Sequence, residues 1–596
     1  MSNESPILTQ FPLSPQQQGM FFESEMSENS SLHLEQSVWC IEGKMDKNRF
    51  MECWQKIHDH HHILRTCFSW NEHTPPIQIV LKPFKIRFNE VSCSNDPAEV
   101  GSKIEQILSD GSAKGFKLNQ PPLSRFSLLI VSDRLHYLIW EHHHILLDGW
   151  SVQLIAKDLI SLYHGESISA SKQYEEYVKW LGDQNSKQSE EYWNSLLNKH
   201  DYATTPGLAG QPAAAGPKTP STTSGQRADG KPETGQAGHA SAFPQTAHGT
   251  PLSHDLSEKQ IRLKWDLDQD RTGKLRSLAK ENRVTLNHLL KTIWALLLSK
   301  WNRSESICYG VTVSGRPYQM EDADKMAGLF INTVPEALLI EPDASFISIA
   351  QQIKELEFER EAHEYHTAGV IHQWSGYPGA KSLFESLLVF DEYNHQEPQF
   401  ERTLQISFED RWYRGGSTSE PVTLLINAGE KVQFECIGLT QYLNSDAIHT
   451  IKSQFQQMLN GILNNGNDQT ADLLIDTLSG ADPLFRLKTN QSESSQSIRE
   501  TTAADPKMVE IWKEVLGTDL LQPDDNFFEL GGHSLLAIKI ANRIRDGYGV
   551  EIPLKNLFQN PTLKGMSEQV STIRNSMNQI QMQTEPVTGE SEEGEL

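Results

Sequence analysis

The sequence predicts a long α/β region followed by a small all-α region. Short apolar runs alternate with helical stretches over residues 11–198 and again over 256–465, which is typical of α/β domains. Residues 204–253 between them are dense in Gly, Pro, Ala, Ser and Thr. Over 505–575 the pattern is helical, in short pieces separated by Gly and Pro.

Composition sets the boundaries. Residues 204–253 carry too few large apolar side chains to offset the entropy of ordering them, so they are predicted to be a disordered insert. A polar stretch before Asp505 indicates a linker, and the acidic residues after Asn575 indicate a disordered tail. The predicted units are ordered regions at 11–203 and 254–465, the insert at 204–253, a linker at 466–504, a helical domain at 505–575 and a tail at 576–596.

Length and charge exclude several classes of protein. At 596 residues the chain is too long for one core. Its formal net charge of -25 argues against nucleic acid or an anionic membrane as the main partner. No signal-peptide pattern and no apolar run long enough to span a bilayer is present. The six cysteines are scattered without a CxxC pair, so a cytoplasmic protein without a structural zinc site is expected.

The segment RLHYLIWEHHHILLDGWS carries the clearest chemical signal. Residues 135–140 have strand composition, and a period of two would place His142 and His144 on one face. Asp148-Gly149 predicts a turn before a helix. Imidazole titrates near pH ~6.5 and therefore suits proton transfer. The alternatives are a structural histidine or a metal-binding cluster. A second triple-histidine run, at residues 60–62, is assigned to structure or surface.

The stretch from His143 to Gly149 (HHILLDG) matches the HHxxxDG motif of the condensation domains of nonribosomal peptide synthetases. In that family the second histidine is the active-site residue, which implies His144. The first histidine and the aspartate are mainly structural, which implies these roles for His143 and Asp148. Asp148 is expected to orient the loop with Arg316 or Arg65 as its ion-pair partner. Further segments resemble other motifs of the family, in the family's order: LSPQQQGMF at 13–21, HILRTCF at 62–68, YEEYVKW at 174–180, VSGRP at 313–317, GLFINTVP at 328–335 and LFESLLVFDEY at 383–393.

This resemblance implies a fold and a subclass. The fold has two lobes, each like chloramphenicol acetyltransferase, which form a V with the active site at their junction. The predicted insert falls between the lobes. Intact His143 and His144 set aside the heterocyclisation domains, which carry Asp there. The wording of the motifs looks most like domains that accept an L-configured donor.

A second motif, DNFFELGGHSL at 525–535, resembles the phosphopantetheine attachment site of peptidyl carrier domains. Read alone, Ser534 is a serine at a helix start and thus a plausible N-cap. The same position suits a phosphate ester, because a helix N-terminus favours negative charge. The resemblance implies 4'-phosphopantetheine on Ser534 and a four-helix bundle, with helices expected at 507–516, 535–546, 554–559 and 563–573.

Together the two resemblances imply amide-bond formation between an upstream carrier-bound acyl or peptidyl thioester and an aminoacyl thioester on the arm of Ser534. Alternatives are transfer of a carrier-bound acyl group to a soluble amine or alcohol, and a catalytically idle recruitment protein. The sequence lacks adenylation and thioesterase motifs, so loading by an adenylation domain in trans is expected. Further expected partners are a phosphopantetheinyl transferase and a downstream synthetase protein that docks on the acidic tail.

Overall fold

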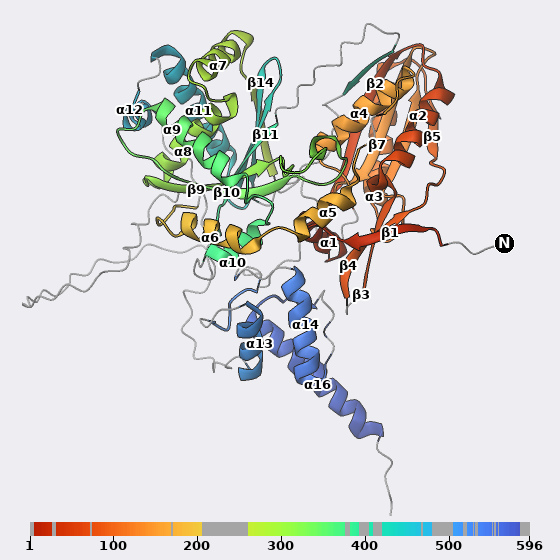
Figure 1. Ribbon diagram of the computed structural model, residues 1–596, viewed down its shortest axis with the longest axis vertical. Coiled ribbons are helices and arrows are strands. Elements are labelled where there is room, and N and C mark those ends of the chain that lie inside the picture. The colour runs from red at the N-terminus through yellow and green to blue at the C-terminus, as the bar shows by residue number, and fades with distance from the viewer. Residues whose placement is uncertain are drawn as a thin grey trace, which may run out of the picture.

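The structure is a computed structural model in which the chain forms two α/β lobes, placed as the arms of a V, with a group of helices below their junction (Figure 1). The predicted V of two lobes followed by a helical domain is confirmed. The described residues are 5–26, 31–71, 74–168, 171–204, 260–375, 382–391, 404–408, 420–465, 469–479, 505–516, 521–527, 530, 534–550, 552, 556–557 and 560–584.

The first lobe is built on a five-stranded sheet in the order β12-β2-β7-β6-β5. Along β7, Leu138 and Trp140 face a core formed with α2 and α4, whereas Tyr137 and Ile139 face α3. The predicted period of two is therefore correct for this strand. A three-stranded sheet, β1-β4-β3, extends the lobe. The helices and strands of the first lobe that come from the start of the chain are β1 (Ile7–Pro12), α1 (Pro15–Met26), β2 (Leu34–Gly43), α2 (Lys47–His60), β3 (Thr66–Asn71), β4 (Thr74–Leu81), β5 (Phe88–Ser92), α3 (Pro97–Lys114), β6 (Ser124–Ile130), β7 (Leu135–His143) and α4 (Gly149–Tyr163).

The second lobe carries a six-stranded sheet in the order β10-β9-β11-β13-β14-β8. Its central helix is α8, which is buried along most of its length. The sequence TLNHLLKTIWALLLSKW predicts a helix with Thr285 as its N-cap, and this cap is present: the Thr285 hydroxyl accepts from the His288 N–H, while the His288 ring accepts from the Thr285 N–H. The elements are β8 (Gln260–Asp266), α7 (Gln269–Glu281), α8 (Leu286–Asn302), β9 (Ser306–Val313), β10 (Asn332–Leu339), α9 (Phe346–Arg360), α10 (Ala368–Ser375), β11 (Ser386–Asp391), β13 (Val422–Ala428), β14 (Val432–Leu439), α11 (Ser445–Asn465) and α12 (Ala471–Asp476).

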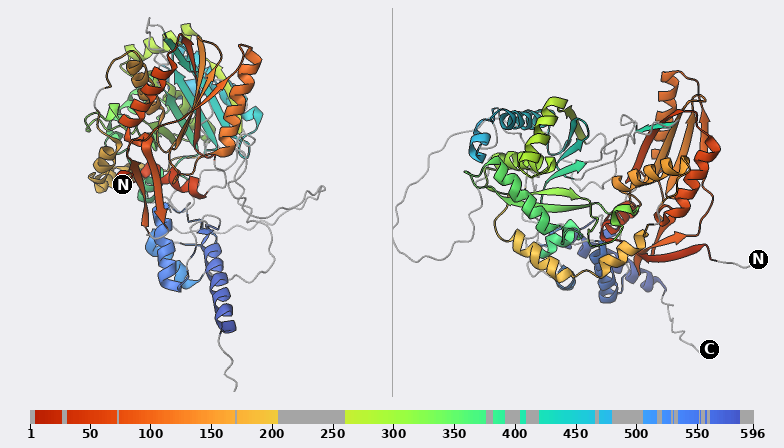
Figure 2. Two further views of the ribbon diagram at one scale, coloured as in Figure 1. Left: turned by 90° about the vertical axis from the view of Figure 1, so that its right-hand side faces the viewer. Right: turned by 45° about the horizontal axis from the view of Figure 1, so that its top comes forward.

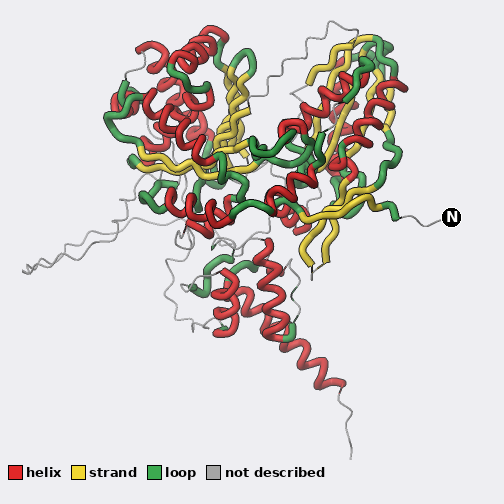
Figure 3. The backbone as a smooth tube through the Cα atoms, viewed as in Figure 1, coloured by secondary structure: helices red, strands yellow, loops and turns green. Residues whose placement is uncertain are grey.

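Two connections join the lobes in opposite directions. Helices α5 (Tyr174–Gly182) and α6 (Ser186–Leu197) run below the junction from the first lobe to the second (Figure 1). Strand β12 (Leu404–Phe408) returns and pairs antiparallel with β2, with Leu404 opposite Gly43. The right-hand view in Figure 2 and the strands in Figure 3 show the same division into lobes. The sheet of the first lobe thus contains a strand from late in the chain.

The helical domain contains α13 (Pro506–Leu516), α14 (Ser534–Tyr548) and α16 (Leu563–Thr584), packed around a buried Trp512. Between α14 and α16, residues 556–557 are helical, and the other positions of the helix expected at 554–559 lie outside the described residues. Helix α14 also lies against α1 of the first lobe. None of the helices in the described part of the chain is long and apolar enough to cross a membrane.

Two boundaries differ from the prediction. Helix α12 lies in the expected linker, and its Leu474 is buried in the core of the second lobe. Helix α16 continues to Thr584, so residues 576–584 are helical where a disordered tail was expected. Of the predicted insert only Thr204 is described, and its carbonyl accepts from the Glu385 N–H at 2.9 Å. The rest of the insert and the tail after Thr584 lie outside the described residues.

Candidate active site

His144 lies one residue beyond the end of β7. The strand ends at His143, so His144 stands in the turn that leads to Gly149, the first residue of α4. Its N–H donates to the carbonyl of His33 at 2.8 Å. Its ring Nδ1 lies 2.7 Å from the carbonyl oxygen of Leu147. Because a carbonyl oxygen only accepts, Nδ1 carries the ring hydrogen, and Nε2 of the neutral ring keeps its lone pair. The turn therefore sets His144 as a base at Nε2.

The two preceding histidines are buried and neutral. His143 Nδ1 accepts from the Ile145 N–H at 3.1 Å, and its Nε2 lies 3.1 Å from the hydroxyl of Ser24. Burial and the neighbouring histidines hold the pKa of His143 well below its usual value. Burial also lowers the pKa of His142, which packs against Trp140, to about 3. Neither ring is set to take a proton, which agrees with a structural role for His143.

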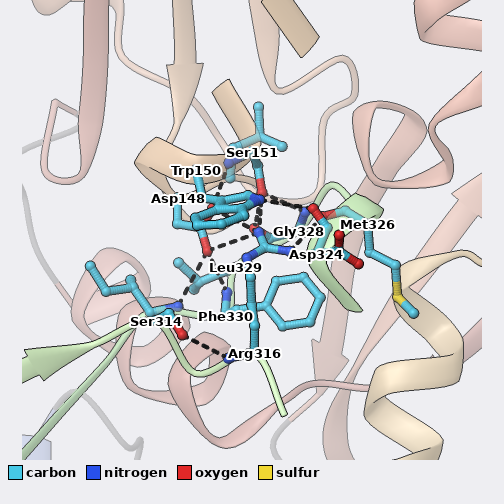
Figure 4. A network of polar contacts seen from close by, with 12 residues as sticks. Asp148, Trp150, Ser151, Ser314, Arg316, Asp324, Met326, Gly328, Leu329 and Phe330 are labelled. Carbon is cyan, nitrogen blue, oxygen red and sulfur yellow. Dashed lines mark hydrogen bonds and ion pairs between the residues drawn. The ribbon is translucent and has the colours of Figure 1, made fainter. Parts of the chain in front are cut away.

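Asp148 fastens the histidine turn to the second lobe (Figure 4). Its Oδ1 accepts from the Ser151 N–H at 2.8 Å and so caps α4. Its Oδ2 accepts from the N–H groups of Phe330 and Ile331 at 3.0 and 3.3 Å. The Arg316 guanidinium donates to both carboxylate oxygens at 3.2 and 3.4 Å. The ion pair predicted between Asp148 and Arg316 is present, and it crosses from one lobe to the other.

Arg316 is held from several sides. Its guanidinium donates to the carbonyls of Ala323 and Met326 at 2.6 and 2.8 Å. It lies over the Phe330 ring at 4.0 Å and near the Trp150 ring at 5.4 Å, as the sticks in Figure 4 show. The side chains of Arg316 and Asp148 are only 5% and 3% exposed, so each charge depends on the other for compensation.

Arg65, the other partner proposed for Asp148, serves a different purpose. It is buried behind α2, where its guanidinium donates to the carbonyls of His58, Asp59 and Leu81. It therefore closes the C-terminal end of α2 and joins it to β4. The proposal that Arg65 pairs with Asp148 is wrong, because the peptide carbonyls beside it already take its donors.

Gly328 allows the lobes to approach this closely, and Gly315 allows a close approach of two loops within the second lobe. A Cβ on Gly328 would lie 2.0 Å from the Tyr174 ring, and Gly328 exchanges hydrogen bonds with the Ser151 hydroxyl. Gly315 has φ of +63°, and a Cβ there would lie 1.8 Å from the Phe330 carbonyl oxygen. These contacts give a physical reason for the glycines of GLFINTVP and VSGRP.

The sequence motifs also contained support residues whose roles the sequence left unassigned. The Gln17 side chain donates to the Ile145 carbonyl at 3.2 Å, directly beside His144. The Tyr174 hydroxyl bridges Ser14 and the Leu329 carbonyl at 3.0 and 2.6 Å. Polar residues of the opening motif and of α5 thus meet beside the histidine turn, where the two lobes are in contact. The sequence signal for Gln17 and Tyr174 was their position within the motifs. Their hydrogen-bond partners could not be predicted, because tertiary structure brings them together.

The carrier serine begins a helix, as predicted. Ser534 is the first residue of α14, and its side chain and residues 531–533 lie outside the described residues. The first backbone N–H groups of a helix lack intrahelical partners and favour an attached phosphodiester. Ser534 therefore fits 4'-phosphopantetheine, which would supply a thiol that holds an acyl group as a thioester. Within the described residues, no three His, Cys, Asp or Glu side chains are grouped as metal ligands.

Comparison with known families decides the assignment. The condensation-domain model matches residues 7–224 and 233–480. The chain belongs to the condensation-domain family. A phosphopantetheine attachment site matches residues 506–570, so this condensation domain is followed by a carrier domain with a covalent 4'-phosphopantetheine cofactor. The family is that of amide-bond-forming enzymes of nonribosomal peptide synthesis.

Curated relatives of the condensation domain are much larger synthetases. Bacitracin synthase 3 of Bacillus licheniformis is 28% identical over 472 residues, which are 78% of this chain and 7% of that protein. Chondramide synthase cmdD of Chondromyces crocatus is 31% identical over 376 residues, which are 61% of this chain and 8% of that protein. The chain thus spans less than a tenth of the length of either relative.

Solved structures establish the fold of the condensation domain. A four-domain nonribosomal peptide synthetase bound to AMP and glycine has a TM-score of 0.59 at 15% identity, covering 79% of this chain and 34% of that one. The first condensation domain of the calcium-dependent antibiotic synthetase has a TM-score of 0.58 at 14% identity, covering 78% and 98%. The condensation domain of the Monacolin K polyketide synthase MokA has a TM-score of 0.61 at 15% identity, covering 78% and 99%.

Proposed function

We propose that this chain joins an upstream carrier-bound acyl or peptidyl group to an aminoacyl group held on the arm of its own Ser534. The observation that carries this proposal is the setting of His144. Its ring is fixed through Nδ1 by the Leu147 carbonyl, which leaves Nε2 as an acceptor, and a carrier domain follows in the same chain. A positioned base and an attached acceptor are the two things that aminolysis of a thioester requires.

In the proposed reaction the amine nitrogen attacks the donor thioester carbonyl. The new C–N bond forms, the C–S bond breaks, the amine proton moves to His144 Nε2, and a proton is returned to the leaving thiolate. The Asp148–Arg316 pair keeps the histidine turn against the second lobe, while buried neutral His143 supports the turn without competing for the proton. His144, His143, Asp148, Gly149 and Arg316 act as one unit in this proposal.

The reaction requires partners outside these 596 residues. We expect an upstream carrier as the donor, a phosphopantetheinyl transferase for Ser534, and an adenylation domain acting in trans. In the relatives, similar condensation domains are small parts of long synthetase chains that contain much further sequence.

The test is a reconstitution with intact-mass detection. The full chain is converted with a phosphopantetheinyl transferase, charged with an aminoacyl group, and mixed with an acylated upstream carrier. The proposal expects one added phosphopantetheine on Ser534, then a shift of its cargo to the condensed product, with both steps lost in Ser534→Ala. Product released to solution from an added amine or alcohol, with no condensed cargo on Ser534, would support acyl transfer to a soluble acceptor instead.

We also propose that the acidic tail after Thr584 docks a downstream synthetase protein. Residues 585–596 include several Glu and lack Lys and Arg, so a basic groove could capture them and raise the effective concentration of the carrier. Deletion of 585–596 is expected to slow transfer to the partner at low protein concentration but not at high concentration. Equal transfer at low concentration would leave solubility as the role of the tail.

A further inference from the structure

Two side chains in the last turn of α1 contact the rings of His33 and His143, and both of these histidines bind the backbone beside His144. Glu23 Oε2 lies 2.8 Å from Nε2 of His33, and the next residue, Ser24, places its hydroxyl 3.1 Å from Nε2 of His143. The rings of His33 and His143 are themselves 5.9 Å apart. Neither Glu23 nor His33 belongs to the motifs that identified the family. One helix end thus supplies a side-chain partner to each of these rings.

His33 has an unusual backbone for its residue type. Its φ is +60°, in the left-handed region that Gly adopts without strain and that is uncommon for residues with a side chain. In this conformation its carbonyl accepts the N–H of His144 at 2.8 Å. A glycine would provide the same carbonyl with less strain, so the imidazole bonded to Glu23 is the feature that a histidine adds here.

His143 connects the same end of α1 to Ile145, the residue that follows His144. Its Nδ1 accepts the Ile145 N–H, so the ring is neutral with a hydrogen on Nε2, which donates to Ser24. Ser24 therefore fixes the tautomer and orientation of the ring on which the Ile145 backbone depends. His144 lies between these two restraints, with His33 on its N–H and the His143–Ile145 contact around its own peptide.

We propose that Glu23, Ser24 and His33 are positioning residues for His144, with α1 acting as the element that sets the direction of its Nε2. The inference rests on the proposed function, because it assigns these residues to the placement of that base. None of the three touches the reacting atoms, so their effects should appear in kcat and in the ring signals of His144.

The first test compares Ser24→Ala with Ser24→Thr and with Ser102→Ala, an exposed serine on α3 of the same lobe. Condensation is measured with a soluble aminoacyl thioester as acceptor, so that carrier docking does not enter. A displaced base costs up to about 10²-fold in rate. We expect Ser24→Ala to lower kcat by about 10- to 100-fold with little change in KM. Ser24→Thr should restore most of kcat, and Ser102→Ala should match wild type.

The second test separates the backbone of His33 from its ring. His33→Gly keeps the left-handed backbone and removes the imidazole, whereas His33→Ala adds strain. We expect both variants to lose kcat, but only His33→Ala to lose thermal stability as well. Full activity in His33→Gly would overturn the role of the ring and leave only the carbonyl contact.

A readout without turnover keeps this inference distinct from the proposed function. ¹⁵N-histidine NMR of the full chain reports which ring nitrogen carries hydrogen, with signals assigned by His143 and His144 substitutions. We expect the Nδ1–H form of His144 in wild type and a mixture of forms in Ser24→Ala and Glu23→Gln. Unchanged tautomers together with unchanged kcat would overturn the inference. Changed tautomers in a protein inactive in condensation would retain the positioning and reject the proposed function.

Discussion

Two triple-histidine runs lie in the same lobe, and they differ in what their rings contact. In the run at 60–62, His61 Nε2 lies 3.1 Å from the Asp158 carboxylate, and His62 Nδ1 is 3.7 Å from Glu175. In the run at 142–144, His144 is bound through Nδ1 to a main-chain carbonyl instead. The first run ties the end of α2 to α4 and α5 through carboxylates, whereas in the second the Nδ1 contact of His144 sets its Nε2 as the acceptor nitrogen.

This difference shows that the hydrogen-bond partner of a histidine indicates whether it can act as a base, whereas the number of histidines in a run does not. A carboxylate partner favours the imidazolium and holds its proton, which suits a structural ion pair. A carbonyl on Nδ1 fixes the neutral tautomer and leaves a lone pair on Nε2. Each run has an aspartate close by in the structure, but Asp158 binds a histidine directly while Asp148 binds backbone and Arg316.

The largest effect is expected from His144→Ala compared with His61→Ala. Loss of a general base lowers condensation by about 10²–10⁴-fold, whereas His61→Ala should retain near wild-type kcat and lower the melting temperature. Single-turnover rates and thermal unfolding of both variants measure this. A chemistry-limited rate that is unchanged in His144→Ala would remove the proposed base, and activity lost on chelation would favour a metal site.

The next effect concerns the aspartates. Arg316→Ala leaves the buried Asp148 carboxylate without its cation, and breaking such a pair costs about 3–5 kcal/mol in the free energy of unfolding. Asp158→Asn should cost much less, because its partnership with His61 keeps a neutral hydrogen bond. Urea unfolding of the two variants checks the order. Equal losses would mean that the two aspartates do the same structural work.

The smallest effect is a pH dependence that arises from His58, two residues before the run at 60–62. His58 is buried with neither ring nitrogen hydrogen-bonded, and burial lowers its pKa from 6.5 to about 4. Its neutral form is favoured in the folded state, so its contribution is full above about pH 6.5 and falls as the pH drops through about 4, by at most about 3 kcal/mol. The thermal midpoint of wild type should therefore fall relative to that of His58→Leu as the pH is lowered from 7 to 4. A difference independent of pH would contradict this.

Local features of the fold were predictable, because their causes lie within a few residues. The alternation of Leu138 and Trp140 gave the faces of β7, and the Thr285 cap gave the start of α8. The end of β7 was not predictable, since it depends on the pairing of His144 with His33. Helix α16 passes its expected end at Ile573 because long unbranched side chains such as Gln and Met favour a helix without an apolar stripe.

The site was predictable as far as its motif reached. The resemblance supplied His144, His143 and Asp148, but the choice between Arg316 and Arg65 required knowledge of which carbonyls surround each guanidinium. No local pattern distinguishes the two arginines. The roles of Gln17 and Tyr174 were hidden for the same reason, since their partners come from distant parts of the chain.

The crossing of β12 has a consequence for dissection and recombination of this enzyme. Because β12 hydrogen-bonds to β2, a fragment that stops at residue 204 would expose the edge of β2 over residues 39–43, an unpaired edge that invites aggregation. The lobes are therefore not exchangeable cassettes, even though a long insert separates them in sequence. A chimera that takes its first lobe from one synthetase and its second from another must transplant residues 404–408 together with β2, or supply a replacement strand.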